Sequence, residues 1–171
     1  MKRAFYVGRF QPFHYGHEKI LKTISEEVDE VVIGIGSAQK SHTIRDPFTA
    51  GERVEMVLKS LETFPIRHYI IPLQDVEYNA LWVPHVKSMS PKFDVAYSNN
   101  PLVIQLFMEA GIEVRRTAMH ERSIYSGTAI RESMIESKNR EWAGYVPPSV
   151  AEVIDEISGI CRIKRLAGND D

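Results

Sequence analysis

The chain has 171 residues, of which 43% are hydrophobic and 26% are charged, and this composition is typical of one compact globular domain. Its formal net charge of −2 does not support bulk attraction to nucleic acid or to a membrane surface, so any cationic site must be local. Cys161 is the single cysteine, which excludes an intrachain disulfide and a cysteine zinc cluster and favours a reducing, cytoplasmic environment.

Apolar residues along the chain switch repeatedly between strand-like and helix-like spacing. A strand-like run at 3–7 precedes a helical pattern at 16–28, and a β-branched run at 30–36 predicts the second strand. Thr49, with Glu52 three residues later, predicts a capping box at the start of the second helix. The buried stripe of that helix is expected to contain Val54, Val57, Leu58 and Leu61.

The same alternation continues to the end of the chain. Further strands are predicted at 67–73, 93–98 and 112–117. Further helices are predicted at 79–89, where Pro84 must lie near the start or kink the helix, at 101–111, and from Ser126 onward. The stretch 147–157 is predicted to open the last helix.

Strands and helices that alternate with short connections are typical of a parallel sheet covered on both faces. The predicted fold class is therefore α/β, a doubly wound, Rossmann-like parallel sheet in a single domain (residues 1–168) with C-terminal helices. The acidic tail 169–171 is predicted to be disordered. In such folds ligands bind at the carboxyl ends of the strands, beside the switch point of the winding.

The stretch GRFQPFHYGH, residues 8–17, lies where the first strand turns into the first helix. Gly8 permits a sharp turn and the close approach of a ligand, and Gly16 does the same at the start of the helix. A helix N-terminus also presents unpaired N–H groups and the positive end of a dipole. This stretch therefore predicts a site for an anion.

The side chains of this stretch point to the same chemistry. His14 and His17 are three residues apart, so both imidazoles can lie on one side, and Arg9 carries a permanent positive charge. Each residue also has a plainer interpretation. His17 could be a core histidine, Arg9 could be solvated, and the histidines could be a metal pair, although the motif offers no usual third ligand. The combination predicts a polyphosphate receptor without a protein-held metal.

A second candidate anion site lies at the start of the helix that Ser126 opens. The hydroxyl groups of Ser126 and Thr128 can bond free backbone N–H groups, and Arg131 falls one turn after Thr128. The plainer interpretation is an ordinary helix cap followed by a surface arginine. Together with the first motif, this stretch is better interpreted as the second half of a triphosphate clamp.

The loop after the second strand carries an imperfect dinucleotide fingerprint and several cations. GIGSAQ at 34–39 has Gln39 in place of the third glycine, so it is only weak support for a dehydrogenase. Lys40, His42 and Arg45 follow within a few residues, and a solvated loop is the alternative interpretation.

Asn79 and Trp82 are candidates for contact with an aromatic base. They are three residues apart, and an amide can pair with a carboxamide while an indole stacks on a ring. By spacing alone, Trp82 could equally belong to the core. Tyr97, Asn99 and Asn100 end the fourth predicted strand, where ligand contacts are also expected, but the sequence assigns them no role.

Several of these stretches carry a resemblance. GRFQPFHYGH resembles the phosphate-binding signature G-x-x-x-P-x-H-x-G-H of the nucleotidyltransferase superfamily, and its G-R-x-Q-P-x-H form is similar to nicotinamide-mononucleotide adenylyltransferases. GIGSAQKSHT (34–43) and PFTAGER (47–53) are similar to the archaeal branch of that family, and YSGTAIR (125–131) resembles its second phosphate motif, S-x-T-x-x-R.

The resemblance implies transfer of AMP from ATP to nicotinamide mononucleotide, which gives NAD and pyrophosphate. The 5′-phosphate is already an anion, so the reaction needs no general base and no covalent intermediate, and catalysis consists of positioning and charge stabilisation. Mg²⁺ would arrive with ATP, held mostly by phosphates and water.

The resemblance also implies roles for individual residues. His14 and His17 would donate to phosphate oxygens, Arg9 would orient the phosphates, and Arg131 would hold the departing phosphates. Asn79 and Trp82 would contact the nicotinamide. The remaining phosphate contacts would come from Gly8, Phe10, Gly16, Lys40, Arg45, Ser126, Gly127 and Thr128.

Other functions remain open at this point. Within the same class, the acceptor could be phosphopantetheine or a flavin nucleotide, and nicotinate mononucleotide could serve as well because a carboxylate has nearly the shape of a carboxamide. A nucleotide sensor that binds ATP without releasing pyrophosphate is the alternative outside enzymes. The archaeal resemblance implies a hexamer, and the partners expected are ATP, nicotinamide mononucleotide and NAD, with no nucleic acid and no membrane.

Overall fold

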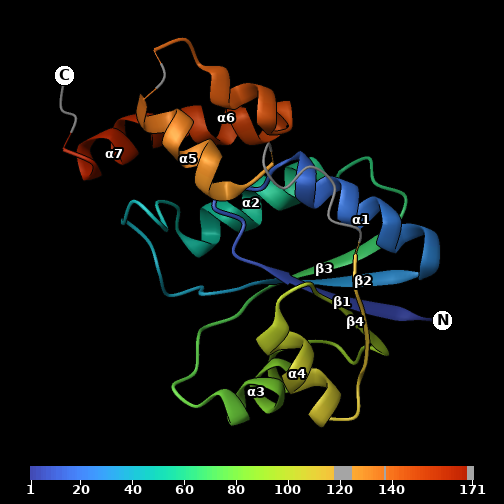
Figure 1. The fold of residues 1–171 in the computed structure, drawn as a ribbon. Helices are drawn as coiled ribbons and strands as arrows, with labels where there is room; N and C mark the ends of the chain where they lie inside the picture. The colour runs from blue at the N-terminus through green and yellow to red at the C-terminus, as the bar shows by residue number, and fades with distance from the viewer. Residues whose placement is uncertain (118–124, 137, 169–171) are drawn as a thin grey trace.

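The central feature of the structure is a parallel sheet (Figure 1). The structure is a computed structural model and describes residues 1–117, 125–136 and 138–168 of the chain. The strands of the sheet are β1 (Arg3–Gly8), β2 (Glu30–Ile35), β3 (Arg67–Pro72), β4 (Val95–Tyr97) and β5 (Glu113–Arg115).

The order of the strands in the sheet is β3-β2-β1-β4-β5, and every neighbouring pair is parallel. The winding runs outward from β1 to β3, and then returns to the other side of β1 for β4 and β5. The switch point therefore lies between β1 and β4, where Tyr6 pairs with Tyr97. The predicted doubly wound α/β fold is confirmed, and the carboxyl end of β1 is the place where a ligand is expected.

Helices cover both faces of this sheet (Figure 1). One face carries α1 and α2 with the C-terminal helices, and the opposite face carries α3 and α4. The helices are α1 (Tyr15–Glu27), α2 (Ala50–Ser60), α3 (Trp82–Met89), α4 (Pro101–Glu109), α5 (Gly127–Glu136), α6 (Pro148–Glu156) and α7 (Gly159–Leu166). Two short 3-10 helices, η1 (Asn79–Leu81) and η2 (Glu141–Tyr145), complete the described elements.

Alternation along the strands separates two hydrophobic cores. In β1, Ala4 and Tyr6 face the core beneath α1 and α2, whereas Phe5 faces the core beneath α3 and α4. Successive residues of a strand point to opposite faces, so a strand covered on both sides is apolar at every position. All six residues of β2 are buried, as expected for this pattern.

The predicted capping box of α2 is present. The Thr49 hydroxyl accepts from the Glu52 N–H at 3.2 Å, and the Glu52 carboxylate accepts from the Thr49 N–H at 2.9 Å. The predicted stripe is wrong at one position, because Leu58 is 49% exposed while Arg53 is fully buried. The buried face is rotated toward Arg53, Met56 and Val57, and it therefore includes a charged side chain that hydropathy had left outside.

Two helix predictions were wrong in detail. The predicted helix at 79–89 is divided into η1 and α3, and Pro84 lies in the first turn of α3, where its missing N–H would be unpaired anyway. The predicted last helix is followed by α7, because Ser158 takes a left-handed φ of 54° that ends α6. At Gly159 a Cβ atom would meet the Ile154 carbonyl oxygen at 3.1 Å, which shows how closely the two helices join.

Two further predictions concern the C-terminal tail and the absence of a membrane-spanning segment. The tail 169–171 lies outside the described residues, so its disorder and the domain boundary at 168 stay predictions. Among the described residues, the helices are all too short or too polar to cross a bilayer.

Candidate active site

Two cavities open at the carboxyl ends of β1 and β4. The first, of about 330 Å³, lies between α1, the ends of β4 and β5, and the start of α5; His14, His17 and Asn99 are among its lining residues. The second, of about 540 Å³, lies beside α3 and α4 and is lined by residues that include Asn79 and Trp82. Both cavities are lined by Val7, Gly8, Ser98 and Asn100. Two ligands bound in these cavities would therefore meet at Gly8, at the switch point of the sheet.

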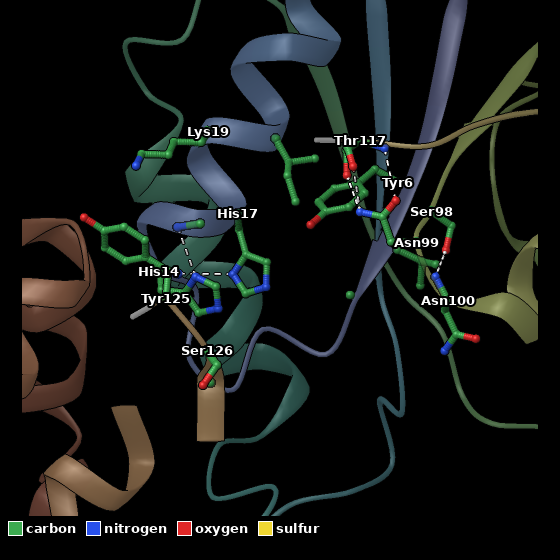
Figure 2. Close-up of a pocket in the computed structure, with 15 residues that line it drawn as sticks. Tyr6, His14, His17, Lys19, Ser98, Asn99, Asn100, Thr117, Tyr125 and Ser126 are labelled. Atoms are coloured by element: carbon green, nitrogen blue, oxygen red, sulfur yellow. Dashed lines mark hydrogen bonds between the residues drawn. The ribbon is translucent and has the colours of Figure 1, made fainter. Parts of the chain in front are cut away.

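His14 and His17 together cap helix α1. The backbone N–H of Gly16 donates to His14 Nδ1 at 3.1 Å, and the backbone N–H of His14 donates to His17 Nδ1 at 3.2 Å (Figure 2). This is a capping box in which imidazoles replace the usual hydroxyl and carboxylate groups. The two rings stack with their centroids 3.6 Å apart. The spacing of three residues therefore creates both the helix start and the paired imidazoles.

These hydrogen bonds also determine which ring nitrogen carries the proton. A neutral imidazole has one N–H, so a ring that accepts at Nδ1 carries its proton on Nε2. Burial, and then the nearby Arg131 charge, lower the pKa of His14 to about 4. Burial, and then the charge of His14, lower the pKa of His17 well below its usual value. Near neutral pH, each ring is thus a neutral donor that can offer Nε2–H to a ligand oxygen in the cavity.

The His17 ring packs against two aromatic side chains, Phe10 and Phe13. The His17 ring lies 4.7 Å from the Phe10 ring and 5.5 Å from the Phe13 ring, measured between centroids. Phe10 is buried and adopts a left-handed φ of 50°, so only its backbone is available to a ligand. A Cβ atom at Gly8 would meet the Phe10 ring at 2.9 Å, which explains the glycine at this position.

The second predicted anion site forms around the start of α5. The Ser126 hydroxyl accepts from the Ala129 N–H at 3.1 Å, so the predicted cap is present. Arg131 is 7% exposed, which is inconsistent with a surface arginine. Its Nη1 donates to the Gln11 carbonyl at 2.8 Å, and its Nη2 donates to the Thr128 hydroxyl at 3.3 Å. Arg131 thus joins α5 to the loop of the first motif, although 120 residues separate it from Gln11.

Glycines allow the two motifs to approach each other. A Cβ atom at Gly127 would meet Arg131 Nη1 at 2.9 Å, and one at Gly16 would meet the His14 ring at 2.9 Å and Tyr125 Cβ at 3.0 Å. Ser126, Gly127 and Gly16 line the first cavity. The structure therefore brings the two predicted phosphate motifs to one cavity.

Arg53, which sequence reasoning missed, holds the loops around these motifs. Its side chain is fully buried, and its Nη1 donates to the carbonyl oxygens of Arg9 at 2.9 Å and Gly36 at 2.8 Å. Its Nη2 donates to the Ser37 carbonyl at 3.2 Å and makes a longer contact with the Lys40 carbonyl at 3.4 Å. One signal in the sequence was available. Arg53 lies three residues before Met56 and four before Val57, a spacing that places it on the buried face of α2.

Two of the predicted cations of the site, Arg9 and Lys40, pair with carboxylates. Arg9 Nη1 lies 3.3 Å from Asp46 Oδ1, and Lys40 Nζ lies 2.9 Å from Asp75 Oδ2. Arg9 and Arg45 line the second cavity, whereas Lys40 does not line it and pairs with Asp75, which does. The positive charge expected in this region is present, and two carboxylates lie within it.

The second cavity contains the predicted pair Asn79 and Trp82. Asn79 lies in η1 and Trp82 begins α3, so the two are not on one regular helix as predicted, but both face the same cavity. The Trp82 ring packs edge-on against Phe107 with centroids 5.2 Å apart. Trp82 is therefore both part of the core beneath α3 and α4 and part of the cavity wall.

Asn99 and Thr117 form the wall of the first cavity opposite the histidines (Figure 2). Asn99 Nδ2 donates to the Thr117 hydroxyl at 2.8 Å and to its carbonyl at 3.0 Å, and the Thr117 N–H donates to Asn99 Oδ1 at 3.2 Å. These bonds fix the ends of β4 and β5 together. The sequence indicated the position of Asn99 at the end of a strand, but it gave no sign of its partner.

Within the described part of the chain, no group of three or more histidine, cysteine, aspartate or glutamate side chains could hold a metal ion. The cavity walls instead provide imidazole N–H groups, hydroxyls, helix N-termini and nearby arginines. This arrangement suits a polyanion, whose oxygens can carry their own cation.

Comparison with known proteins agrees with this geometry. The profile of the cytidylyltransferase-like family matches residues 5–133. The chain belongs to the cytidylyltransferase-like family. It is 57% identical over 171 residues to a nicotinamide-nucleotide adenylyltransferase of Methanosarcina barkeri, covering 100% of this chain and 98% of the relative. It is 58% identical over 170 residues to the Methanosarcina mazei protein of the same name, covering 99% and 97%.

Solved structures with low identity agree with the fold of this cytidylyltransferase-like chain. A bifunctional NMN adenylyltransferase/ADP ribose pyrophosphatase from Francisella tularensis, complexed with AMP and a Mn ion, superposes with a TM-score of 0.69 at 18% identity. The match covers 99% of this chain but only 56% of that longer protein. A nicotinic acid mononucleotide adenylyltransferase of Plasmodium falciparum superposes with a TM-score of 0.65 at 13% identity, covering 92% and 96%.

We predict that His14→Asn makes stability less sensitive to acid. Between pH 6.5 and about 4, the unfolded chain holds a proton on His14 that the folded chain lacks, so acidification favours unfolding. At pH 4, the buried imidazole of His14 should lower the free energy of unfolding by on the order of 3 kcal/mol relative to neutral pH. Asparagine keeps an acceptor at the N-cap and does not titrate. Urea unfolding at several pH values should therefore show a shallower decline for the variant. An unchanged slope for His14→Asn would contradict the assignment.

We predict that Arg53→Met destabilises the fold severely. Several buried carbonyl groups lose their donor, each at a cost of ~1–3 kcal/mol, so urea unfolding should show a total loss of at least about 3 kcal/mol. Arg53→Lys keeps the charge but cannot reach both loops, and it should be intermediate. Arg67, whose side chain is 70% exposed and pairs with Glu30, is the matched control, and Arg67→Met should cost less than about 1 kcal/mol. An Arg53→Met protein as stable as this control would refute the bridging role.

Proposed function

We infer that this chain is a nicotinamide-nucleotide adenylyltransferase, which joins ATP and nicotinamide mononucleotide to give NAD and pyrophosphate. The observation that carries this inference is the pair of cavities that meet at Gly8, one beside the phosphate motifs and one beside Asn79 and Trp82. The full-length identity to archaeal proteins of that name supports the same reaction.

In the proposed reaction, ATP binds in the first cavity and the mononucleotide binds in the second. A 5′-phosphate oxygen of the mononucleotide attacks the α-phosphorus of ATP, and the bond between that phosphorus and the oxygen bridging to the β-phosphate breaks. Pyrophosphate takes the bonding electrons and leaves from the side opposite the attack. The nucleophile is an anion at neutral pH, so no residue must remove a proton.

The residues act by positioning and by donating to developing charge. His14 and His17 donate from Nε2 to oxygens of the α-phosphate region, and their low pKa values keep them neutral donors. Arg9 orients the phosphates from the second cavity. Arg131 supports the loop through Gln11 and adds positive charge behind the departing phosphates. The remaining contacts proposed for the phosphates come from Gly8, Phe10, Gly16, Lys40, Arg45, Ser126, Gly127 and Thr128.

A divalent cation, Mg²⁺, is proposed to enter as the ATP complex, as part of the substrate. The donor set supports this, because the walls near the phosphate motifs offer cations and N–H groups and suit an ion held by phosphate oxygens and water. Asn79 and Trp82 are proposed to contact the nicotinamide, through the amide and the ring respectively. Cytoplasmic location and hexameric assembly also belong to the proposal.

The reaction is tested by pyrophosphate release with Mg²⁺ and ATP and a panel of acceptors. We expect release with nicotinamide mononucleotide, accompanied by NAD in equal amount, and none with flavin mononucleotide or phosphopantetheine. Nicotinate mononucleotide is included because its shape fits the same pocket. Release only with the flavin or pantetheine acceptor would retain the phosphate site and refute the base site. ATP binding without release for any acceptor would favour a nucleotide sensor.

The role of the histidines is tested by His17→Ala. Removing one preorganised donor to developing negative charge should lower kcat by about 10²–10³, and it should change the KM for ATP much less. Steady-state kinetics with the best acceptor measure both constants. His68→Ala on β3, prepared in the same way, is the control and should retain full turnover. A His17→Ala enzyme with nearly full turnover would exclude this role for the imidazole.

A further inference from the structure

Asp46 is a buried carboxylate in the loop between β2 and α2, among the arginines of the site. Its side chain is 6% exposed, and its Oδ1 lies 3.3 Å from Arg9 Nη1. Its backbone is fixed independently, because its N–H donates to the Thr43 hydroxyl at 2.9 Å and its carbonyl accepts from the Thr43 N–H at 3.2 Å. The turn at 43–46 thus holds this carboxylate against Arg9.

The surroundings of Asp46 are strongly cationic. Arg53 and Arg131 both interact electrostatically with Asp46 and with Arg9, and Arg131 also interacts with Arg45. Other carboxylates of this region have their own partners. Glu52 makes a two-point pair with Arg162 at 2.7 and 2.8 Å, and Asp75 pairs with Lys40 at 2.9 Å. Glu132, which is exposed, also interacts electrostatically with Arg131.

The contact between Asp46 and Arg9 is a loose one. Strong contacts between a guanidinium and a carboxylate are about 2.7–2.9 Å long and often two-pointed. The pair of Glu52 and Arg162 has this geometry, whereas Asp46 and Arg9 make one contact at 3.3 Å, and the Arg9 side chain is 36% exposed. Arg9 can therefore exchange this partner for another anion at low cost.

We propose that Asp46 is an internal competitor of the polyphosphate. In the free protein its carboxylate neutralises the arginine cluster and contacts Arg9 in place of a phosphate oxygen. With polyphosphate bound, the fixed negative charge weakens the hold of the cluster, so pyrophosphate leaves faster. The inference rests on the proposed function, since it takes Arg9 as a phosphate-binding residue.

The test is the affinity of Asp46→Asn for inorganic pyrophosphate, measured by calorimetric titration in low salt, with and without Mg²⁺. Removing the competing charge should tighten binding by about tenfold, equivalent to ~1.4 kcal/mol. Without ligand, the variant should melt at a lower temperature than the wild type, because its arginines repel each other without a counter-charge. A residue with only a structural role would lower the melting temperature without improving affinity.

The matched control is Asp155→Asn on α6. This substitution removes the same charge from an exposed pair, that of Asp155 with Arg140. Its affinity for pyrophosphate should equal that of the wild type. If Asp46→Asn binds pyrophosphate equally well or more weakly, the proposal is overturned. Weaker binding only in the presence of Mg²⁺ would instead assign Asp46 to the metal carried by the phosphates.

A folding failure would also be informative. If Asp46→Asn does not stay folded alone, pyrophosphate present during refolding should restore it, since the anion replaces the lost counter-charge. Asp46→Ser is the second variant, and failure of pyrophosphate to restore either protein would refute the proposal. The acceptor panel on the wild type tests the proposed function separately, so the two ideas can fail independently.

Discussion

The two loops beside the cavities, after β1 and after β2, depend on one buried guanidinium, that of Arg53. Arg53 is fully buried and donates to backbone carbonyls from the loop after β1 and the loop after β2. Phe10 and Ser37, each next to one of these carbonyls, have left-handed φ values of 50° and 49°, which are unfavourable for residues with a side chain. The fork of Arg53 offsets this cost, because it satisfies several carbonyls at once with a rigid, permanently charged group. Without it, these buried carbonyl groups would lose their donor, and the two loops would lose the side chain that joins them.

The charges around Arg53 show how a site for a polyanion can exist before the polyanion arrives. The histidines are neutral because they are buried beside a positive charge, so they add donors without adding repulsion. The arginines keep their charge and are held by carbonyls or by Asp46. In the proposed reaction, these groups would already be in position to stabilise transition-state charge, which is the arrangement that makes electrostatic catalysis effective.

Much of this arrangement was predictable where the signal is local. The caps predicted at Thr49 and Ser126 depend on neighbours within a few residues, and both are present. The pairing of the His14 and His17 rings on one side was predicted from their spacing, but the capping box that they form was not. Prediction was wrong where burial depends on distant partners. Leu58 was placed inside by its hydropathy, yet that face of α2 is exposed because Arg53 turns inward to bind the loops. The break before α7 was also missed, because serine does not by itself signal the left-handed φ of 54° that Ser158 takes at the end of α6.

Local patterns were enough to predict the alternation of strands and helices and the phosphate motifs, because periodicity and capping are properties of short segments. The doubly wound sheet followed from that alternation. The tertiary structure alone decided which groups face one another. It joined Arg131 to Gln11 across 120 residues, placed Asp46 beside Arg9, and paired Asn99 with Thr117. These contacts arise because the parallel strands bring loops that are far apart in the sequence to one edge of the sheet, and no local pattern in the sequence records which side chains meet there.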